Sequence, residues 1–191
     1  MELWLATNNT GKLIEFKTLL PHVDIHSQGE LSVFSPPPEN GKTFEENARI
    51  KARSLKSVTT GVWVIGEDSC LEVDGLGNLP GIHSARYAGP KAAATENVAK
   101  LLKMMGLKSA HNRKARFQCY MVIYSPEGME TVISGTLQGS IGTKSLGTEG
   151  FGYDPIFIPE GETKTLAELG QTRKNQISHR AQAIRKLNTL F

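Results

Sequence analysis

Two stretches near the C-terminal end of the chain combine aromatic, acidic and cationic side chains. One reads FGYDP from position 151, and the other reads KNQISHR from position 174. Lysine and arginine bind anionic oxygens, aromatic rings stack on planar rings, and aspartate accepts hydrogen bonds from N–H edges. Asp154 is therefore a candidate acceptor for a purine N–H, and Phe151 or Tyr153 is a candidate stacking ring. Together these residue types predict a nucleotide site.

The second stretch lies where the last helix is predicted to begin. If Ser178 caps that helix, His179 and Arg180 fall in its first turn, where the helix dipole disfavours cations. A bound anion or polar ring would offset this repulsion, and Lys174 adds to the same positive field. The alternative is that these cations serve solubility alone.

A polar loop near the N-terminus is a candidate phosphate-binding loop. It follows a strand predicted over residues 2–6 and precedes a helix predicted over residues 12–20. Backbone N–H groups at a helix start bind anions, and a lysine adds a full charge. The Walker spacing is absent, and the loop alone also fits an ordinary strand-to-helix turn. The candidate ligands are Thr7, Asn8, Asn9, Thr10, Gly11 and Lys12.

Acidic side chains form the third candidate group. Glu67 and Asp68 follow an apolar strand predicted over residues 62–66, and open α/β sheets bind ligands at the carboxyl ends of strands. Adjacent side chains on an extended chain point to opposite faces, so these two carboxylates are not expected to share one ligand shell. A turn or helix-cap aspartate is the alternative.

Glu39, in the proline-rich loop over residues 31–42, is a candidate partner for Asp68. Mg²⁺ takes one or two carboxylates together with phosphate oxygens and waters, so these two acids would suit it. Lys51 follows Asn47 by four residues on a predicted helix, which places both side chains on one helix face. The alternative is that Glu39 and Lys51 are simply solvated.

The order of predicted elements indicates an α/β fold with a mixed sheet, because strand–helix units alternate with a hairpin. A capping box at Thr43 and Glu46 starts the second helix. Further strands are predicted over residues 23–27, 115–125, 130–137 and 155–159, and helices over 44–58, 90–105, 165–169 and from 178 onward.

The composition is that of an ordinary globular domain. The 191 residues are 39% hydrophobic and 21% charged, enough for one domain or two closely packed lobes. A net charge of +3 without long Lys/Arg blocks argues against nucleic acid as a partner. Cys70 and Cys119 lack metal-type spacing and indicate reduced thiols in a cytoplasmic protein. Neither a signal peptide nor a membrane segment is expected.

Five segments along the chain carry a family resemblance. They read ATNNTGKLIEFKTLL, ENGKTFEENARIKA, GEDSCLEVDGLGNLPGIHSARYAG, GFGYDPIFIPEG and KNQISHRAQAI. In these motifs and their order the chain resembles the inosine/xanthosine triphosphate pyrophosphatase family nearly from end to end. The resemblance implies a single domain over residues 1–191, with an elongated mixed β-sheet flanked by helices and two lobes around a central substrate cleft.

The resemblance also implies an activity. Members hydrolyse ITP, dITP and XTP to the monophosphate and pyrophosphate with Mg²⁺, and are usually homodimers. Asp68 would be the catalytic carboxylate, as general base and metal-associated group, with Glu39 as the second metal carboxylate. Lys51 and Ser69 would contact the substrate, and the N-terminal loop would bind phosphate. The base-recognition set would be Phe151, Gly152, Tyr153, Asp154, Lys174, His179 and Arg180.

One motif departs from the family pattern. Many members read D-D-S-G where this chain reads EDSC from position 67, so the second acid and the hydroxyl are kept. Cys70 replaces a residue that readily takes positive φ, which leaves the local turn and the role of Glu67 open. Donors on His179 and Arg180 would accept inosine over adenine, because adenine presents an amino donor at C6. They do not explain the rejection of guanine.

Two other functions stay open at this point. The first is a pyrophosphatase for other modified nucleotides, such as methylated pyrimidine triphosphates. The second is a nucleotide-binding regulatory module without turnover, against which the presence of Lys12, Glu39 and Asp68 together argues. RNA binding would need a broader basic surface or a recognisable module.

Overall fold

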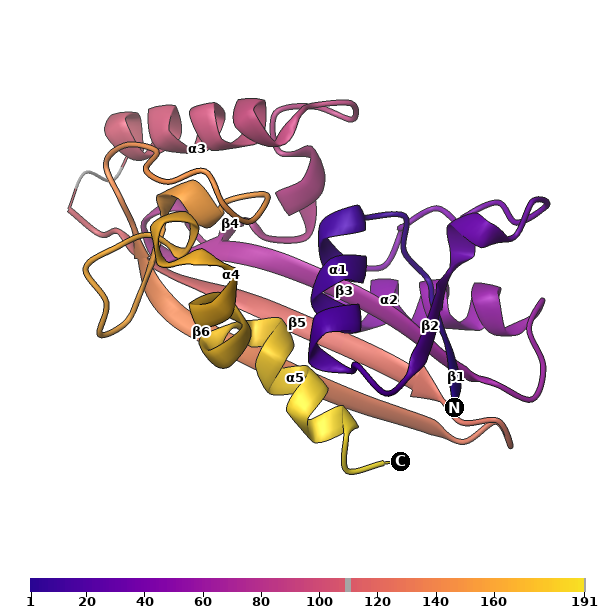
Figure 1. The fold of residues 1–191 in the computed structure, drawn as a ribbon. Coiled ribbons are helices and arrows are strands. Elements are labelled where there is room, and N and C mark those ends of the chain that lie inside the picture. The colour runs from indigo at the N-terminus through magenta and orange to yellow at the C-terminus, as the bar shows by residue number, and fades with distance from the viewer. Residues whose placement is uncertain (109–110, 191) are drawn as a thin grey trace. The chain divides into compact units, whose positions relative to one another are not determined.

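The computed structural model describes residues 1–108 and 111–190, and Figure 1 shows how its helices and strands run. The elements are, in chain order, β1 Glu2–Leu5, α1 Thr10–Leu19, β2 Asp24–Ser27, α2 Phe44–Lys56, β3 Trp63–Val73, β4 Leu79–Pro80, α3 Ala94–Lys108, β5 Lys114–Tyr124, β6 Glu130–Ile141, β7 Phe157–Pro159, α4 Leu166–Ile177 and α5 His179–Leu187.

The strands form one mixed sheet. Its order is β2-β1-β3-β5-β6-β7, with β4 paired to β3 as the seventh strand. β1 runs parallel to β2 and β3, whereas β4 and β7 are antiparallel to their neighbours. A tight turn joins β5 to β6, closed by the N–H of Ser125 donating to the carbonyl of Met129 at 3.0 Å. The predicted α/β class, with a mixed sheet flanked by helices, is confirmed.

The chain divides into two compact units. Unit 1 comprises residues 1–68, 119–135 and 180–191, and unit 2 comprises residues 69–118 and 136–179. The long strands β3, β5 and β6 contribute residues to both units.

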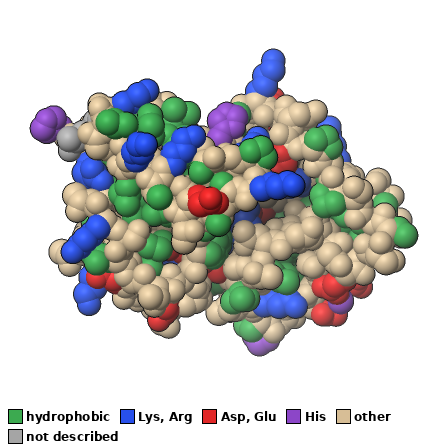
Figure 2. Space-filling view, turned by 90° about the horizontal axis from the view of Figure 1, so that it is seen from above, with side chains coloured by type: hydrophobic (Ala, Val, Ile, Leu, Met, Phe, Trp, Pro, Cys, Tyr) green, Lys and Arg blue, Asp and Glu red, His purple; other side chains and the backbone are tan. Residues whose placement is uncertain are grey.

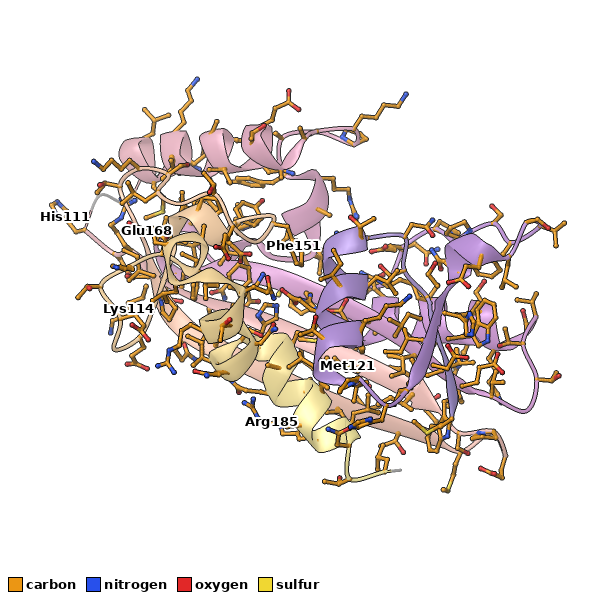
Figure 3. The ribbon with its side chains drawn as sticks, in the orientation of Figure 1. His111, Lys114, Met121, Phe151, Glu168 and Arg185 are labelled. Carbon is orange, nitrogen blue, oxygen red and sulfur yellow. The ribbon has the colours of Figure 1, made fainter. Side chains whose placement is uncertain are left out.

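In unit 1, helices α1 and α5 cover one face of the strands and α2 covers the other (Figure 1). Alternation along the strands produces the two layers, because successive side chains point to opposite faces. Ile65 packs in the cluster that contains Phe16 of α1 and Ile184 of α5, whereas Val64 packs with Leu55 of α2. Met121 of β5, labelled in Figure 3, belongs to the first cluster.

Helix α2 approaches β3 closely because the strand has a glycine at position 66. A Cβ atom at Gly66 would lie 2.0 Å from the carbonyl oxygen of Ala48 and 2.5 Å from the backbone nitrogen of Ala52. Those two alanines are one helical turn apart, so they form the flat patch of α2 that meets the strand. The close contact brings Lys51, which lies between them, to the level of Asp68.

In unit 2, helices α3 and α4 pack on one core cluster. Leu101 and Met105 of α3 meet Phe117 of β5, Phe157 of β7 and Leu166 of α4 in that cluster. Helix α4 begins with a complete capping box, in which Glu168, labelled in Figure 3, accepts a hydrogen bond from the N–H of Thr165 at 2.9 Å.

Several predicted element boundaries are wrong. β3 does not end at Gly66 but continues to Val73, because Glu67 and Asp68 are buried and paired with cations rather than left at a strand end. Cys70 lies inside this strand, so the turn expected there is absent. Helix α3 begins at Ala94 rather than near Pro90.

Helix α4 is also longer than predicted. It runs over twelve residues rather than one or two turns, with a break at Gly170, whose φ of 78° is outside the helical range. Helix α5 begins at His179 as predicted, but ends at Leu187, before Leu190.

No helix in the described part of the chain has the length and apolar character that crossing a membrane requires. Figure 2 looks onto the face that carries α3, where lysine and arginine side chains are interspersed with hydrophobic and neutral ones. This mixed surface agrees with the small net charge of +3.

Candidate functional site

The predicted phosphate loop lies between β1 and α1 and is shaped by its own side chains. Asn9 caps α1, with its Oδ1 accepting from the N–H of Lys12 at 3.0 Å. The hydroxyl of Thr7 accepts from the N–H of Asn9 at 3.1 Å. Helix α1 therefore starts at Thr10, two residues earlier than predicted, and Lys12 lies in its first turn. The loop has the strand-to-helix geometry of an anion site, while phosphate binding by it stays a prediction.

Lys12 points to a buried carboxylate on β3. Its Nζ lies 2.5 Å from Oε2 of Glu67, which is 3% exposed. Oε1 of Glu67 accepts from Nη2 of Arg180 at 3.0 Å and from Sγ of Cys119 at 3.3 Å. Nη1 of Arg180 donates to Oε2 of Glu15 at 2.5 Å. The result is a chain of alternating charges through the interior of unit 1.

Asp68 makes a separate ionic group on the α2 side of β3. Its Oδ1 lies 2.8 Å from Nζ of Lys51, and Oε1 of Glu39 approaches the same Nζ at 3.5 Å. Glu67 and Asp68 have different ion-pair partners, because Lys12 and Arg180 pair with the first and Lys51 with the second, as side chains on opposite faces of a strand should. Sequence alternation thus places the two acids correctly. That the two acids do not share one ligand shell stays a prediction.

The loop that carries Glu39 is fastened to α2 by Asn47. Oδ1 of Asn47, which is buried, accepts from the N–H of Gly41 at 2.8 Å. A Cβ atom at Gly41 would lie 2.7 Å from that same Oδ1, so the backbone approaches too closely for a side chain. Asn47 and Lys51 therefore face the same side of α2, as the sequence predicts, and together hold Glu39 near Asp68.

Burial and charge act in opposite directions on this group. Burial raises the pKa of Asp68 above its ordinary value, and the cations Lys51 and Lys12 reduce that rise. Burial also disfavours the charged form of Lys51, but Asp68 and Glu39 outweigh it and the pKa of Lys51 is raised. A carboxylate with a raised pKa is a better proton acceptor than an exposed one. Asp68 has the environment of a general base.

The donor set fits a magnesium ion. Two carboxylates, Glu39 and Asp68, converge on one positive charge, the ammonium of Lys51. Among the described residues, no group of three or more His, Cys, Asp or Glu side chains is arranged to hold a metal. Mg²⁺ retains waters and phosphate oxygens and needs only one or two carboxylates, so this pair suits it better than a metal requiring a full protein cage.

In unit 2, Asp154 organises the aromatic loop. Its Oδ2 accepts from the N–H of Phe151 at 2.8 Å and from Nζ of Lys174 at 2.5 Å. A Cβ atom at Gly150, where φ is +79°, would lie 2.1 Å from this oxygen. Both the backbone conformation and the close approach require glycine there. Asp154 thus holds the loop through its hydrogen bonds with Phe151 and Lys174. Its contact with a purine stays a prediction.

The structure distinguishes the two aromatic candidates. Phe151, labelled in Figure 3, is partly exposed, and Nζ of Lys174 lies 4.2 Å from its ring centroid. Tyr153 is 6% exposed, and its hydroxyl donates to the carbonyl of Ser84 at 2.8 Å. Burial raises the pKa of Tyr153, which keeps the hydroxyl protonated. Phe151 is therefore the better placed ring for stacking on a base.

The remaining predicted site residues are placed as follows. His179 is 3% exposed and stacks on Phe117, with ring centroids 4.8 Å apart and an angle of 11° between the planes. Arg180 is 1% exposed and paired with Glu15 and Glu67. Direct donation from His179 and Arg180 to a base stays a prediction. The other predicted substrate-binding residues are partly or fully exposed, namely Thr7, Asn8, Asn9, Thr10, Gly11, Ser69 and Gly152.

Comparison with known proteins identifies the family. The model of the Ham1 family matches residues 3–190. The chain belongs to the Ham1 family. It is 57% identical over 188 residues to the dITP/XTP pyrophosphatase of Bdellovibrio bacteriovorus, covering 97% of this chain and 94% of the relative. It is 44% identical over 193 residues to the dITP/XTP pyrophosphatase of Bacillus licheniformis, covering 100% and 97%.

A solved Ham1 structure agrees with the fold. The Ham1 protein of Staphylococcus aureus superimposes with a TM-score of 0.87 and 39% identity, covering 100% of this chain and 97% of that one. The resemblance predicted from the five motifs is confirmed, because the relatives named above are dITP/XTP pyrophosphatases.

Three residues of this Ham1 family member were missed by sequence reasoning. Glu15 is buried and pairs with Arg180, and Cys119 contacts Glu67. Phe117 supplies the ring on which His179 stacks. Only Glu15 left a signal, since it follows Lys12 by three residues and so shares its helix face. Strand alternation does not reveal which side chain of another element a given residue will meet.

Proposed function

We propose that this Ham1 family member hydrolyses non-standard purine nucleoside triphosphates, namely ITP, dITP and XTP, to the monophosphate and pyrophosphate. Such an activity would remove these compounds from the nucleotide pool. The observation that carries the proposal is the buried pairing of Asp68 with Lys51, with Glu39 on the same ammonium group. The relatives named above add support, because both bear the name of this activity.

Hydrolysis to pyrophosphate requires water to attack the α-phosphorus while the bond to the bridging oxygen breaks. Asp68 accepts the proton of that water, a task for which its raised pKa suits it. Lys12 and the N–H groups at the start of α1 bind the phosphate oxygens, and Lys51 adds a second positive charge. Displacement at phosphorus depends mainly on such positioning and charge stabilisation.

Mg²⁺ is part of the proposal. Glu39 and Asp68 would hold it, and when bound it would neutralise phosphate charge as a Lewis acid. The substrate oxygens and waters would complete its shell.

We assign base recognition to residues of the FGYDP and KNQISHR motifs. Phe151 stacks on the purine, with Lys174 and Asp154 fixing its loop. His179 and Arg180 favour a C6 oxo group over an amino group, because a site built of donors rejects a donor. The residue that rejects guanine is not among those assigned.

The assembly and location belong to the proposal as well. We infer a cytoplasmic homodimer that uses neither nucleic acid nor a membrane as a partner. The small net charge of +3 supports the exclusion of nucleic acid, since electrostatic binding to phosphate backbones needs many cations.

The experiment is a substrate panel with pyrophosphate detection. Purified protein with Mg²⁺ is given ITP, dITP, XTP, GTP, ATP and a methylated pyrimidine triphosphate, and kcat/KM is measured for each. We expect the first three to exceed ATP by about 10² or more. Preference for the pyrimidine would reassign the substrate class. Binding of ITP without pyrophosphate release would indicate a regulatory module instead.

A further inference from the structure

We propose that Glu67 is a positioning residue, which fixes the ammonium group of Lys12 for the triphosphate and does not hold the metal. The proposal rests on the proposed function, because it assigns a further part of the same phosphate-binding machinery. It also gives a role to one of the two residues, Glu67 and Cys70, at which this chain departs from the D-D-S-G pattern.

Glu67 is held firmly from the protein interior. Its carboxylate is 3% exposed, and Oε1 accepts from the guanidinium of Arg180 at 3.0 Å and from the thiol of Cys119 at 3.3 Å. Burial, followed by the adjacent Glu67 charge, raises the pKa of Cys119, so the thiol keeps its proton and donates. The carboxylate therefore cannot rotate without breaking both contacts.

Arg180 is itself braced. Its second terminal nitrogen lies 2.5 Å from Glu15 of α1, and both side chains are 2% exposed. Burial disfavours the guanidinium charge, but Glu67 and Glu15 outweigh this effect and the pKa of Arg180 is raised. Arg180 is a fixed cation with two buried anions on it.

Lys12 lies at the more accessible end of the row of ion-paired side chains that runs from Lys12 through Glu67 and Arg180 to Glu15. Its side chain is 15% exposed, against 2% for Arg180, and its Nζ lies 2.5 Å from Oε2 of Glu67. A lysine has a flexible four-carbon stem and loses rotamer entropy when it binds a phosphate. Glu67 removes much of that freedom before the substrate arrives, which is preorganisation.

The contacts of Glu67 differ from those of the metal-suited pair. Both of its oxygens are already ion-paired with cations, Oε2 with Lys12 at 2.5 Å and Oε1 with Arg180 at 3.0 Å. Asp68 and Glu39, in contrast, converge on a single ammonium group. Two carboxylates that approach the same point can both coordinate one metal ion. A carboxylate paired with two cations instead holds those cations in fixed positions.

The role predicts a particular kinetic effect. Loss of the Glu67 charge frees Lys12 and weakens ground-state binding of the triphosphate, so KM rises while kcat changes less. A charge-assisted contact of this kind corresponds to about tenfold or more in affinity. We therefore expect Glu67→Gln to raise KM for ITP by about tenfold or more, with an unchanged Mg²⁺ concentration for half-maximal rate.

Glu72→Gln is the matched control. Glu72 lies on the same strand, and its Oε2 pairs with Nη2 of Arg116 at 2.7 Å and accepts from Gln118 at 2.6 Å. The substitution removes the same charge from a comparable ion pair, so it changes thermal stability but leaves KM for ITP unaltered.

A double-mutant cycle and a binding measurement complete the test. Lys12→Met should raise KM as Glu67→Gln does, and the two together should raise it little further, because they remove one interaction. Calorimetric titration with inorganic pyrophosphate should show the same loss of affinity without turnover. This readout separates failure of the inference from failure of the proposed function, which the wild-type substrate panel decides.

Opposite results overturn the inference. A fall in kcat at unchanged KM, recovery of Glu67→Gln by high Mg²⁺, or fully additive effects with Lys12→Met would each make Glu67 a catalytic or metal-binding group. If Glu67→Gln gives no cooperative thermal unfolding, Glu67→Asp decides instead. Aspartate is the residue that the D-D-S-G pattern has there, so the charge is kept, but in this chain the shorter side chain lengthens the contact that Glu67 makes with Lys12 at 2.5 Å, and pyrophosphate affinity falls. Unchanged affinity would overturn the inference.

Discussion

At the scale of single residues, the function depends on where charge is buried. Burial of Asp68 disfavours its ionised form, whereas the ammonium group of Lys51, 2.8 Å from Oδ1, stabilises that form. Removing one partner of such a pair strongly destabilises the folded protein, because the other charge is left buried and unpaired. In the same arrangement the neighbours of Asp68 set its proton affinity, which the proposed role of general base requires.

Replacement of Asp68 by asparagine is expected to remove most turnover. The amide keeps the size of the side chain but cannot accept the proton of water, and a general base contributes about 10²–10⁴ to the rate. Pyrophosphate release measures kcat, and calorimetry with ITP should still detect binding. Asp74→Asn, at a residue paired with Arg116 at 3.1 Å, is the control. Near-normal turnover of Asp68→Asn would remove Asp68 from the catalytic role.

Replacement of Lys51 by glutamine should move the acid limb of the pH profile. Burial raises the pKa of Asp68 and Lys51 lowers it, so loss of Lys51 raises that pKa further. Asp68 then stays protonated to a higher pH, and the fall of kcat/KM at acid pH begins at a higher pH than in the wild type. Lys56→Gln, on the same helix, should leave the limb in place. A shift to lower pH would contradict the assignment of Asp68 as base.

At the scale of elements, the contact between α2 and β3 positions this pair. The start of α2 was predicted well from Thr43 and Glu46, because Thr43 caps the helix and its hydroxyl accepts from the N–H of Glu46 at 3.1 Å. Sequence reasoning ended β3 too early, since two adjacent acids resemble a strand end and nothing local reveals their buried partners. The break in α4 at Gly170 was missed because helical spacing does not report backbone φ.

Gly66→Ala should destabilise the protein and reduce activity together. The new Cβ would lie 2.0 Å from the carbonyl of Ala48, so α2 must move away from the strand. Overpacking of this kind costs about 1–3 kcal/mol and displaces Lys51 from Asp68. Urea unfolding measures the first effect and kcat/KM the second.

Gly106→Ala supplies the control for that substitution. Nothing lies within 4 Å of a Cβ atom at Gly106, which is inside α3. Alanine there should stabilise the protein by about 0.5–1 kcal/mol without altering kcat/KM. Equal stability of the two variants would contradict the close packing of α2 on β3.

Across the whole molecule, buried ionic groups lie beside the motifs recognised in the sequence, and both units contain them. Unit 1 contains the Lys51–Asp68 pair and the Lys12–Glu67–Arg180 chain, and unit 2 contains the Asp154–Lys174 pair. The motifs, their order and the family could be predicted from the sequence. The pairing of Arg180 with Glu15, 165 residues apart, could not, because only the fold brings them together.

The proposed reaction cleaves the nucleotide between its α- and β-phosphates. Phosphorus NMR of ITP incubated with the wild-type protein and Mg²⁺ tests it directly, since each product has its own resonance. We expect equal amounts of inosine monophosphate and pyrophosphate, with no inosine diphosphate, and little reaction with Asp68→Asn. Accumulation of inosine diphosphate and orthophosphate, or persistence of ITP with the wild-type protein, would contradict the proposed reaction.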